Sequence, residues 1–343
     1  MLKLIDLLLL AFLLLCLSGL RVSTKKHPLQ EDVMGRRQTA ALRGMLCILI
    51  LFHHSALLTG SGLSVGGLKR IGAYVVGLFY ALSGYGLMAS WEKNGLRGFW
   101  GKRFRGTILP YLVLSAAAIL IRLVIGETLT VREILLSFVN GKPLIRYSWF
   151  ILAILLYYVL FWASGLIAKN DEALLIVLSS VGVFFLGFVL KAAGMSEYWY
   201  NAGWCFPLGL IWRSRQPFIQ GAFARHSGIY LLLAGAVSLW WIVIAEHFFW
   251  FDYIARLFST LSVTVFILLL MLRLRNENPV LRFLGGISME IYLIHGLIVT
   301  VLLCLLSPED QPTLFLALLF PVTILLAWLF HLGVKCLARK KQY

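Results

Sequence analysis

Charged residues are scarce in this sequence. Asp, Glu, Lys and Arg together make up 13% of its 343 residues, compared with about 25% in soluble domains. Hydrophobic residues make up 60%, and the mean hydropathy is +0.88. So little charge excludes a soluble globular domain and is typical of a protein whose helices cross the lipid bilayer several times.

Acidic residues are the scarcer of the two charged classes. Asp and Glu number 15 against 31 Lys and Arg, which gives a formal net charge of +16. A basic excess can indicate a nucleic-acid partner. Here, however, Lys and Arg occupy short segments between apolar runs, where they set the orientation of a membrane protein. We therefore expect the lipid bilayer as a partner and no nucleic acid.

Cysteine is also rare, and its spacing indicates neither a disulfide framework nor a metal site. The five cysteines lie in or beside apolar runs, and no pair has the CxxC spacing. No HExxH motif accompanies His53, His54 and His295, so no metal is expected. Internal repeats and low-complexity segments are lacking, and no loop is long enough to form a domain. Any chemistry must therefore take place in a helical bundle or at its two ends.

Apolar runs of membrane-spanning length fill most of the chain. The first run, residues 4–20, could be a secretory signal peptide, but no A-x-A-like cleavage site follows it. We predict residues 1–24 as an extra N-terminal transmembrane helix or uncleaved signal anchor, and residues 36–338 as a membrane-embedded domain. The fold class is then an all-α polytopic membrane protein with about ten transmembrane helices plus one additional N-terminal apolar helix. The ten spans are placed near 40–60, 71–90, 107–125, 148–168, 173–191, 199–212, 227–246, 254–272, 285–306 and 313–334.

The distribution of basic residues predicts the orientation. Of the 31 Lys and Arg residues, 22 fall in six segments that alternate with the remaining loops. The positive-inside rule places these segments in the cytoplasm, with the N-terminus outside and the C-terminus cytoplasmic in a cell (plasma) membrane protein. The longest external loop, 126–147, is expected to carry a short interfacial helix. The six segments are 21–43, 92–106, 168–172, 213–226, 273–284 and 335–343.

The stretch from Arg43 to His54 is as apolar as a transmembrane helix, yet it opens on an arginine and closes on two histidines. Ionisable side chains inside a membrane span are costly and by default indicate a functional site. At about 100° per residue, the eleven steps from Arg43 to His54 end roughly 20° past three full turns, about 16 Å along the axis. Arg43 and His54 therefore share a helix face, whereas His53 points about 80° away.

A second candidate is the basic stretch Lys102, Arg103 and Arg105 ahead of Pro110. It could simply anchor the protein at the membrane surface. Alternatively, three cations at the start of a helix would bind an anion such as a polyphosphate, because the helix dipole and the free N–H groups favour negative charge there. Arg43 lies at the same predicted level of the membrane and could join them.

Two further motifs place polar residues in apolar helices. Ser83 and Tyr85 lie in the glycine-containing stretch 77–86, which indicates either close helix packing or a site wall. Ser288, Tyr292 and His295 lie near one face of a later helix. The alternative for His295 is a histidine that bonds to a neighbouring helix without a role in chemistry.

Together these stretches resemble the acyltransferase-3 family of integral-membrane acyltransferases, typically O-acetyltransferases of carbohydrates and other envelope molecules. The resemblance covers about residues 36–334. Arg43 to His54 resembles the family's arginine–ten residues–histidine signature, residues 79–86 its FF-x-LSGYG element, and Ser288 to His295 its S-x-x-IYLIH element. In one departure, Arg103 and Arg105 are one residue apart, whereas the family often has two residues between arginines ahead of the proline.

The resemblance implies a membrane-bound acyltransferase of the O-acetyltransferase type. Its donor would be cytoplasmic acetyl-CoA or another acyl-CoA, and its acceptor a hydroxyl of a polysaccharide or other cell-envelope molecule. His54 would act as base or acyl relay together with Arg43. The phosphates of the donor would lie against Lys102, Arg103 and Arg105. Residues expected to position the substrate are His53, Ser83, Tyr85, Ser288, Tyr292 and His295.

Two other functions remain open from the sequence. One is a polytopic carrier or flippase for a saccharide or lipid-linked sugar, without covalent chemistry. Many carriers show internal repeats, and no corresponding halves are found in this chain. The other is a different membrane-bound acyltransferase lineage with a deep histidine. The sequence leaves the acceptor, the acyl group and the oligomeric state undetermined.

Overall fold

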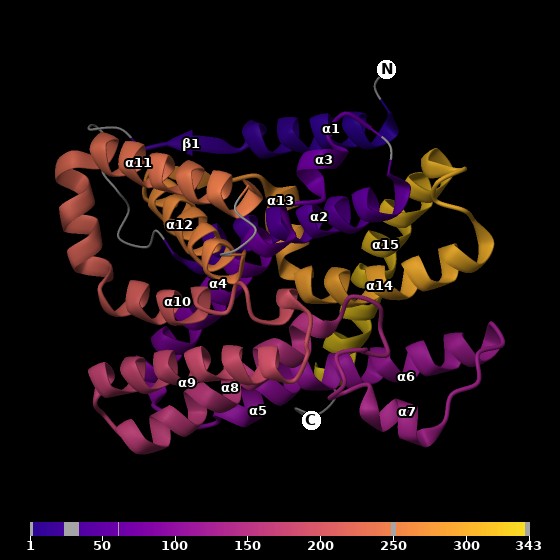
Figure 1. Cartoon of the computed structure of the whole chain (residues 1–343), viewed down its shortest axis with the longest axis horizontal. Helices are drawn as coiled ribbons and strands as arrows, with labels where there is room; N and C mark the ends of the chain where they lie inside the picture. Colours follow the sequence, from indigo (N-terminus) through magenta and orange to yellow (C-terminus); the bar gives the residue numbers. More distant parts are fainter. Residues whose placement is uncertain (1–2, 24–33, 61, 248–251, 340–343) are drawn as a thin grey trace.

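The computed structural model describes residues 3–23, 34–60, 62–247 and 252–339, and this part of the chain is almost entirely helical (Figure 1). Parts of the predicted segments 1–24, 21–43 and 335–343 lie outside the described residues. The elements are α1 (Leu4–Ser18), β1 (Leu20–Val22), α2 (Arg36–Thr59), α3 (Val65–Leu68), α4 (Gly72–Asn94), α5 (Phe99–Arg103), η1 (Phe104–Ile108), α6 (Leu109–Val124), α7 (Val131–Leu136), α8 (Trp149–Ala168), α9 (Glu172–Ala192), η2 (Glu197–Trp199), α10 (Cys205–Ser214), α11 (Gln216–His247), α12 (Asp252–Arg273), β2 (Leu274–Asn276), α13 (Pro279–Gly286), α14 (Ser288–Leu305) and α15 (Pro312–Arg339).

Nine helices among the described residues are long and apolar enough to cross a membrane, and α1 adds a shorter apolar helix. The predicted fold class, an all-α polytopic membrane protein, is therefore confirmed. The predicted span at 199–212 is not one of the nine. It is divided between the 3₁₀ turn η2 and the ten-residue helix α10, which is too short for a bilayer. Pro207 lies in the first turn of α10, where a missing N–H is tolerated.

The predicted helix start near Pro110 is wrong. The helix runs without a break from Phe99 to Val124 through α5, η1 and α6. The π-helical turn η1 precedes Pro110 and accommodates it, since proline cannot donate the normal backbone hydrogen bond. Lys102, Arg103 and Arg105 thus lie within this helix, a few residues after its start at Phe99, and not in a loop in front of it.

Helix α2 lies at the centre of the bundle because glycines let its neighbours approach. A Cβ atom added to Gly285 of α13 would collide with the carbonyl oxygen of Ala40, and one added to Gly44 would collide with that of Leu281. Small residues of this kind bring membrane helices into backbone contact. Gly84 packs in the same way against the carbonyl of Phe206 in α10, which supports the packing interpretation of stretch 77–86.

Several of the segments rich in Lys and Arg, among them β1, the α8–α9 turn and the α10–α11 turn, lie at one end of the bundle, on the left in Figure 1, which we call the basic end. There β1 pairs with β2 in antiparallel register, with Arg21 opposite Arg275. Arg213 of α10 forms an ion pair with Glu92 of α4 at 2.6 Å. The loop between α6 and α8 lies at the opposite end and contains the expected short helix, α7. Which of these two ends faces the cytoplasm stays a prediction.

Helix α1 runs beside α2 and is fastened near both of its ends. Asp6 accepts hydrogen bonds from the backbone N–H groups of Leu63 and Ser64, beyond the far end of α2. At the basic end, Asn276 donates to the carbonyl of Cys16 and Asn278 to that of Leu15. The 15 residues of α1 extend about 22 Å, less than a full bilayer core. That residues 1–24 cross the membrane stays a prediction.

Candidate functional site

The structure joins His54 and His295, which are 241 residues apart in the sequence. Nδ1 of His54 in α2 lies 2.8 Å from Nε2 of His295 in α14. Both side chains are buried, with exposed fractions of 7% and 0%. One nitrogen of the pair must donate and the other accept, so the hydrogen bond couples the tautomers of the two imidazoles. His295 is therefore bonded to a neighbouring helix, and the neighbour is the histidine predicted as functional.

Two tyrosines complete the surroundings of the histidine pair. The ring of Tyr147 stacks on His54, with centroids 3.8 Å apart and planes at 10°. The hydroxyl of Tyr292, one turn before His295 in α14, donates to the backbone carbonyl of Tyr147. Tyr292 was predicted in the site, but Tyr147 was not. Only the folded loop before α8 brings Tyr147 to His54.

Three other predicted residues lie away from the histidine pair's hydrogen bonds. Nδ1 of His53 donates to the carbonyl of Leu68 at 2.9 Å, as expected from its different helix face. The hydroxyl of Ser288 donates to the carbonyl of Gly285 at the start of α14. Ser83 is half-buried in α4. A role of these three in positioning an acceptor stays a prediction.

A cavity of about 1380 Å³ opens at the basic end. Eight basic residues and one acidic residue, Glu277, are among the described residues that line it. It contains three residues predicted from sequence: Arg43, Lys102 and Tyr85. Charge of one sign in a cleft concentrates ligands of the opposite sign, so this cavity suits a large anion. The eight residues that define this basic cavity are Arg21, Arg37, Arg43, Lys93, Lys102, Arg213, Arg273 and Arg275.

Hydrogen bonds hold part of the cavity wall in place. Tyr85 donates to Oε1 of Gln216 at 2.6 Å, and Arg213 extends its guanidinium over the Tyr85 ring, 5.7 Å from the centroid. Arg213 is also bonded to both carboxylate oxygens of Glu92. Among the described residues, no acidic side chain forms an ion pair with Arg43 or Lys102. Their charge is available to a ligand.

Arg103 and Arg105 do not line the basic cavity. The guanidinium of Arg103 lies over the rings of Phe99 and Tyr158, 5.4 and 5.2 Å from their centroids. Arg105 is exposed, and its Nε donates to the carbonyl of Gly101. Because the helix is continuous here, successive residues point about 100° apart, and Lys102 alone of the three reaches the cavity.

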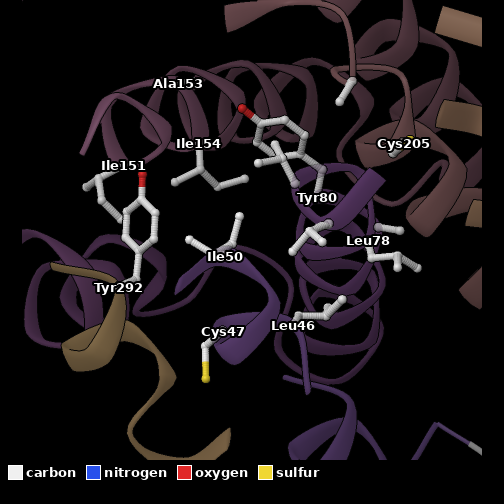
Figure 2. Packing of buried hydrophobic residues seen from close by; sticks show 14 of the residues in the cluster. Leu46, Cys47, Ile50, Leu78, Tyr80, Ile151, Ala153, Ile154, Cys205 and Tyr292 are labelled. Atoms are coloured by element: carbon white, nitrogen blue, oxygen red, sulfur yellow. The ribbon is translucent and has the colours of Figure 1, made fainter. Parts of the chain in front are cut away.

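An apolar layer separates the basic cavity from the histidine pair. Cys47 and Ile50 lie at positions four and seven residues after Arg43, on the face that leads to His54, and they are 1% and 3% exposed. Figure 2 shows them with Leu46 among buried side chains of α4, α8 and α14, including Leu78, Ile154 and Tyr292. The basic cavity and the histidine pair therefore share helix α2, but Arg43 and His54 are about 16 Å apart along it.

Comparison with known proteins identifies the family. No curated protein and no solved structure matches the chain. A family model, acyltransferase-3, described as an acyltransferase domain, matches residues 40–332. This range contains most of α2, both members of the histidine pair and most of the residues that line the basic cavity, and it agrees with the resemblance seen in the motifs. The chain belongs to the acyltransferase-3 family and is a membrane acyltransferase.

Proposed function

We propose that this protein transfers an acyl group, acetyl in the first instance, from cytoplasmic acyl-CoA to a hydroxyl of a carbohydrate or other cell-envelope acceptor. The observation that carries the proposal is the arrangement of α2, with a buried histidine pair at one level and a basic cavity at another. A phosphate-rich donor suits the cavity, and acyl transfer suits the histidines. The basic end then faces the cytoplasm of a plasma membrane protein, as the positive-inside rule predicts.

The basic cavity fits the phosphorylated part of an acyl-CoA. Its volume of about 1380 Å³ exceeds the roughly 300–1,000 Å³ of pockets for drug-sized ligands. Arginine forks bind phosphate with two parallel hydrogen bonds, and lysine contributes a point charge. Arg43 and Lys102 are the strongest candidates for phosphate contacts, because both line the cavity and neither forms an ion pair with an acidic side chain in the described part of the chain. Arg103 and Arg105 rank below them as donor contacts.

The hydrogen bond of the histidine pair suits His54 for proton transfer. If Nδ1 of His54 donates to Nε2 of His295, Nε2 of His54 keeps its lone pair and can accept the proton of the acceptor hydroxyl. The hydroxyl oxygen then attacks the thioester carbonyl, a C–O bond forms, the C–S bond breaks, and the CoA thiolate leaves and takes up a proton. In the relay alternative, Nε2 of His54 itself attacks the thioester carbonyl and CoA leaves. The acyl group then passes from His54 to the acceptor hydroxyl.

The thioester must pass the apolar layer to reach His54. Cys47 and Ile50 occupy the direct path along α2, so their side chains and those packed on them must shift when the donor binds. An apolar passage of this kind excludes water, which limits hydrolysis of the thioester during transfer.

Radiolabel transfer tests the proposal. Membranes from cells that carry the native envelope, with the gene deleted and replaced by wild type or His54→Ala, are incubated with acetyl-CoA labelled in the acetyl group. Label should enter envelope molecules with wild type and fall by a factor on the order of a thousand with His54→Ala. His247→Ala is the matched control, because His247 is exposed and its Nδ1 bonds to the carbonyl of Val243 in its own helix. Undiminished transfer by His54→Ala would contradict the role of His54.

Direct binding separates the proposal from a carrier or flippase. A carrier without covalent chemistry has no need of acyl-CoA, so it should not bind the donor. An acyltransferase should bind acyl-CoA and lose that binding when Arg43 and Lys102 are reversed in charge. Mass spectrometry of envelope glycans with and without the gene then identifies the acceptor as the molecule that gains one acyl mass.

A further inference from the structure

Tyr147 has a backbone conformation that tyrosine rarely adopts. Among the described residues other than glycine, only Tyr147 and Lys169 have a positive φ, 66° and 54° respectively. Side chains with a Cβ are disfavoured there, and such residues persist where the surrounding structure holds them in place. Glycine would fit this position without strain, so a tyrosine at this position is best explained by its ring.

Several contacts hold the Tyr147 backbone against α14. Its carbonyl accepts the hydroxyl hydrogen bond of Tyr292. The next residue, Ser148, is buried and donates to the carbonyl of Ile145 at 2.9 Å. The preceding carbonyl, of Arg146, packs so closely on Gly296 that a Cβ there would collide with it. The loop before α8 is therefore fastened to the helix that carries His295.

The ring that this loop presents is nearly parallel to both imidazoles. Its plane lies at 10° to that of His54 and at 5° to that of His295, with centroids 3.8 Å and 5.8 Å away. The ring also packs in a small apolar cluster with Val299, Leu302 and Phe315. It thus lies flat against His54 and also contacts this apolar cluster.

We propose that Tyr147 is a positioning residue that fixes the plane of the His54 imidazole. Stacking on one face, together with the hydrogen bond that Nδ1 of His54 donates to Nε2 of His295, leaves His54 one orientation and directs its Nε2 toward the reacting atoms. The hydroxyl of Tyr147 has no part in this, and the ring alone is needed. The inference rests on the proposed function, because it assigns His54 as the group that acts on the acyl transfer.

Three variants test the proposal. Tyr147→Phe keeps the ring, Tyr147→Gly removes it while suiting the positive φ, and Lys169→Gly is the matched control for backbone relief far from the histidines. Initial rates of labelled acetyl transfer are measured over a range of acetyl-CoA concentrations, with detergent-solubilised protein checked for a single gel-filtration peak.

We expect Tyr147→Gly to lower kcat by tenfold to a hundredfold at an unchanged KM for acetyl-CoA, since a displaced catalytic group costs about this much. Tyr147→Phe and Lys169→Gly should both transfer at the wild-type rate. Wild-type kcat in Tyr147→Gly would overturn the proposal, as would a loss in Tyr147→Phe equal to that in Tyr147→Gly. A loss shared equally by Lys169→Gly would overturn it too, because the effect would then belong to backbone relief.

A second measurement distinguishes failure of this inference from failure of the proposed function. Carbethoxylation of His54 by diethyl pyrocarbonate, followed by peptide mass spectrometry, needs neither donor nor acceptor. The Tyr147→Gly variant should react faster at His54 than wild type or Tyr147→Phe, because one face of the imidazole is uncovered. An unchanged rate would overturn the positioning role. If wild-type protein transfers no acetyl group while the carbethoxylation rates differ as expected, the proposed function fails but the position of the ring is supported.

Discussion

The basic cavity and the histidine pair both include residues of helix α2 but are built in opposite ways. The cavity is open, and its eight cations come from β1, α2, α4, α5, α10, α12 and β2. The histidine pair is buried, and it depends on one hydrogen bond between α2 and α14 and one stacked ring. Charge that attracts a donor can be shared among many side chains, whereas proton transfer needs one geometry. A single substitution in the cavity should therefore weaken donor binding only modestly, whereas a single substitution at the histidine pair should lower kcat strongly.

The largest effect beyond His54 itself is expected at His295. His295→Ala removes the partner of His54 Nδ1 and should lower kcat about a hundredfold, with acetyl-CoA affinity unchanged, because a partner that orients a functional histidine is typically worth 10–100-fold. His295→Gln offers an oxygen to the same nitrogen and should retain more activity than the alanine variant. Transfer rates and equilibrium binding on the same preparations check this. Equal losses of affinity and kcat would remove the distinction between the two regions.

The next largest effect is expected for a single cation of the cavity. Arg43→Gln should weaken acetyl-CoA binding about tenfold, the equivalent of one charge-assisted hydrogen bond of about 1.4 kcal/mol, with kcat at saturating donor nearly unchanged. Lys93→Gln, at another point of the cavity wall, should have a smaller effect of the same kind. Isothermal titration checks both variants. A collapse of kcat in Arg43→Gln would instead place Arg43 in the chemistry, as the sequence motif predicts.

Salt should affect the two regions differently. Raising ionic strength from about 0.05 to 0.5 M shortens the Debye length severalfold, so acetyl-CoA affinity should fall by about threefold or more. The buried pair is shielded from ions, and kcat at saturating donor should not change. Affinity that is independent of salt would contradict binding by the basic cavity.

The smallest effect is expected for Arg105. Its side chain is exposed and bonded to its own helix, so Arg105→Gln should change acetyl-CoA affinity by less than about twofold, the range of a surface charge. Lys102→Gln, three positions earlier and inside the cavity, is the matched comparison. A larger loss of affinity in Arg105→Gln than in Lys102→Gln would contradict donor binding in the basic cavity.

Helix periodicity alone separated His54 from His53, because the two side chains point to different faces of one span. It could not pair His54 with His295, since that contact depends on how α2 and α14 cross.

The sequence did not indicate Tyr147 as a site residue, because a positive φ in a loop leaves no mark in the residue type. Arg213 and Arg273 were likewise missed, as cations scattered over the chain resemble ordinary membrane anchors until folding gathers them. The prediction of a membrane span at 199–212 was wrong because apolar composition does not reveal where turns interrupt a helix.

The central claim is that donor binding and acyl transfer occupy separate regions of one helix. The most direct test measures the acetyl-CoA dissociation constant and single-turnover transfer on the same purified His54→Ala protein, in nanodiscs supplied with envelope extract. The separation predicts a dissociation constant within about twofold of wild type together with no detectable transfer. Loss of donor binding in step with loss of transfer, or transfer at the wild-type rate, would contradict it.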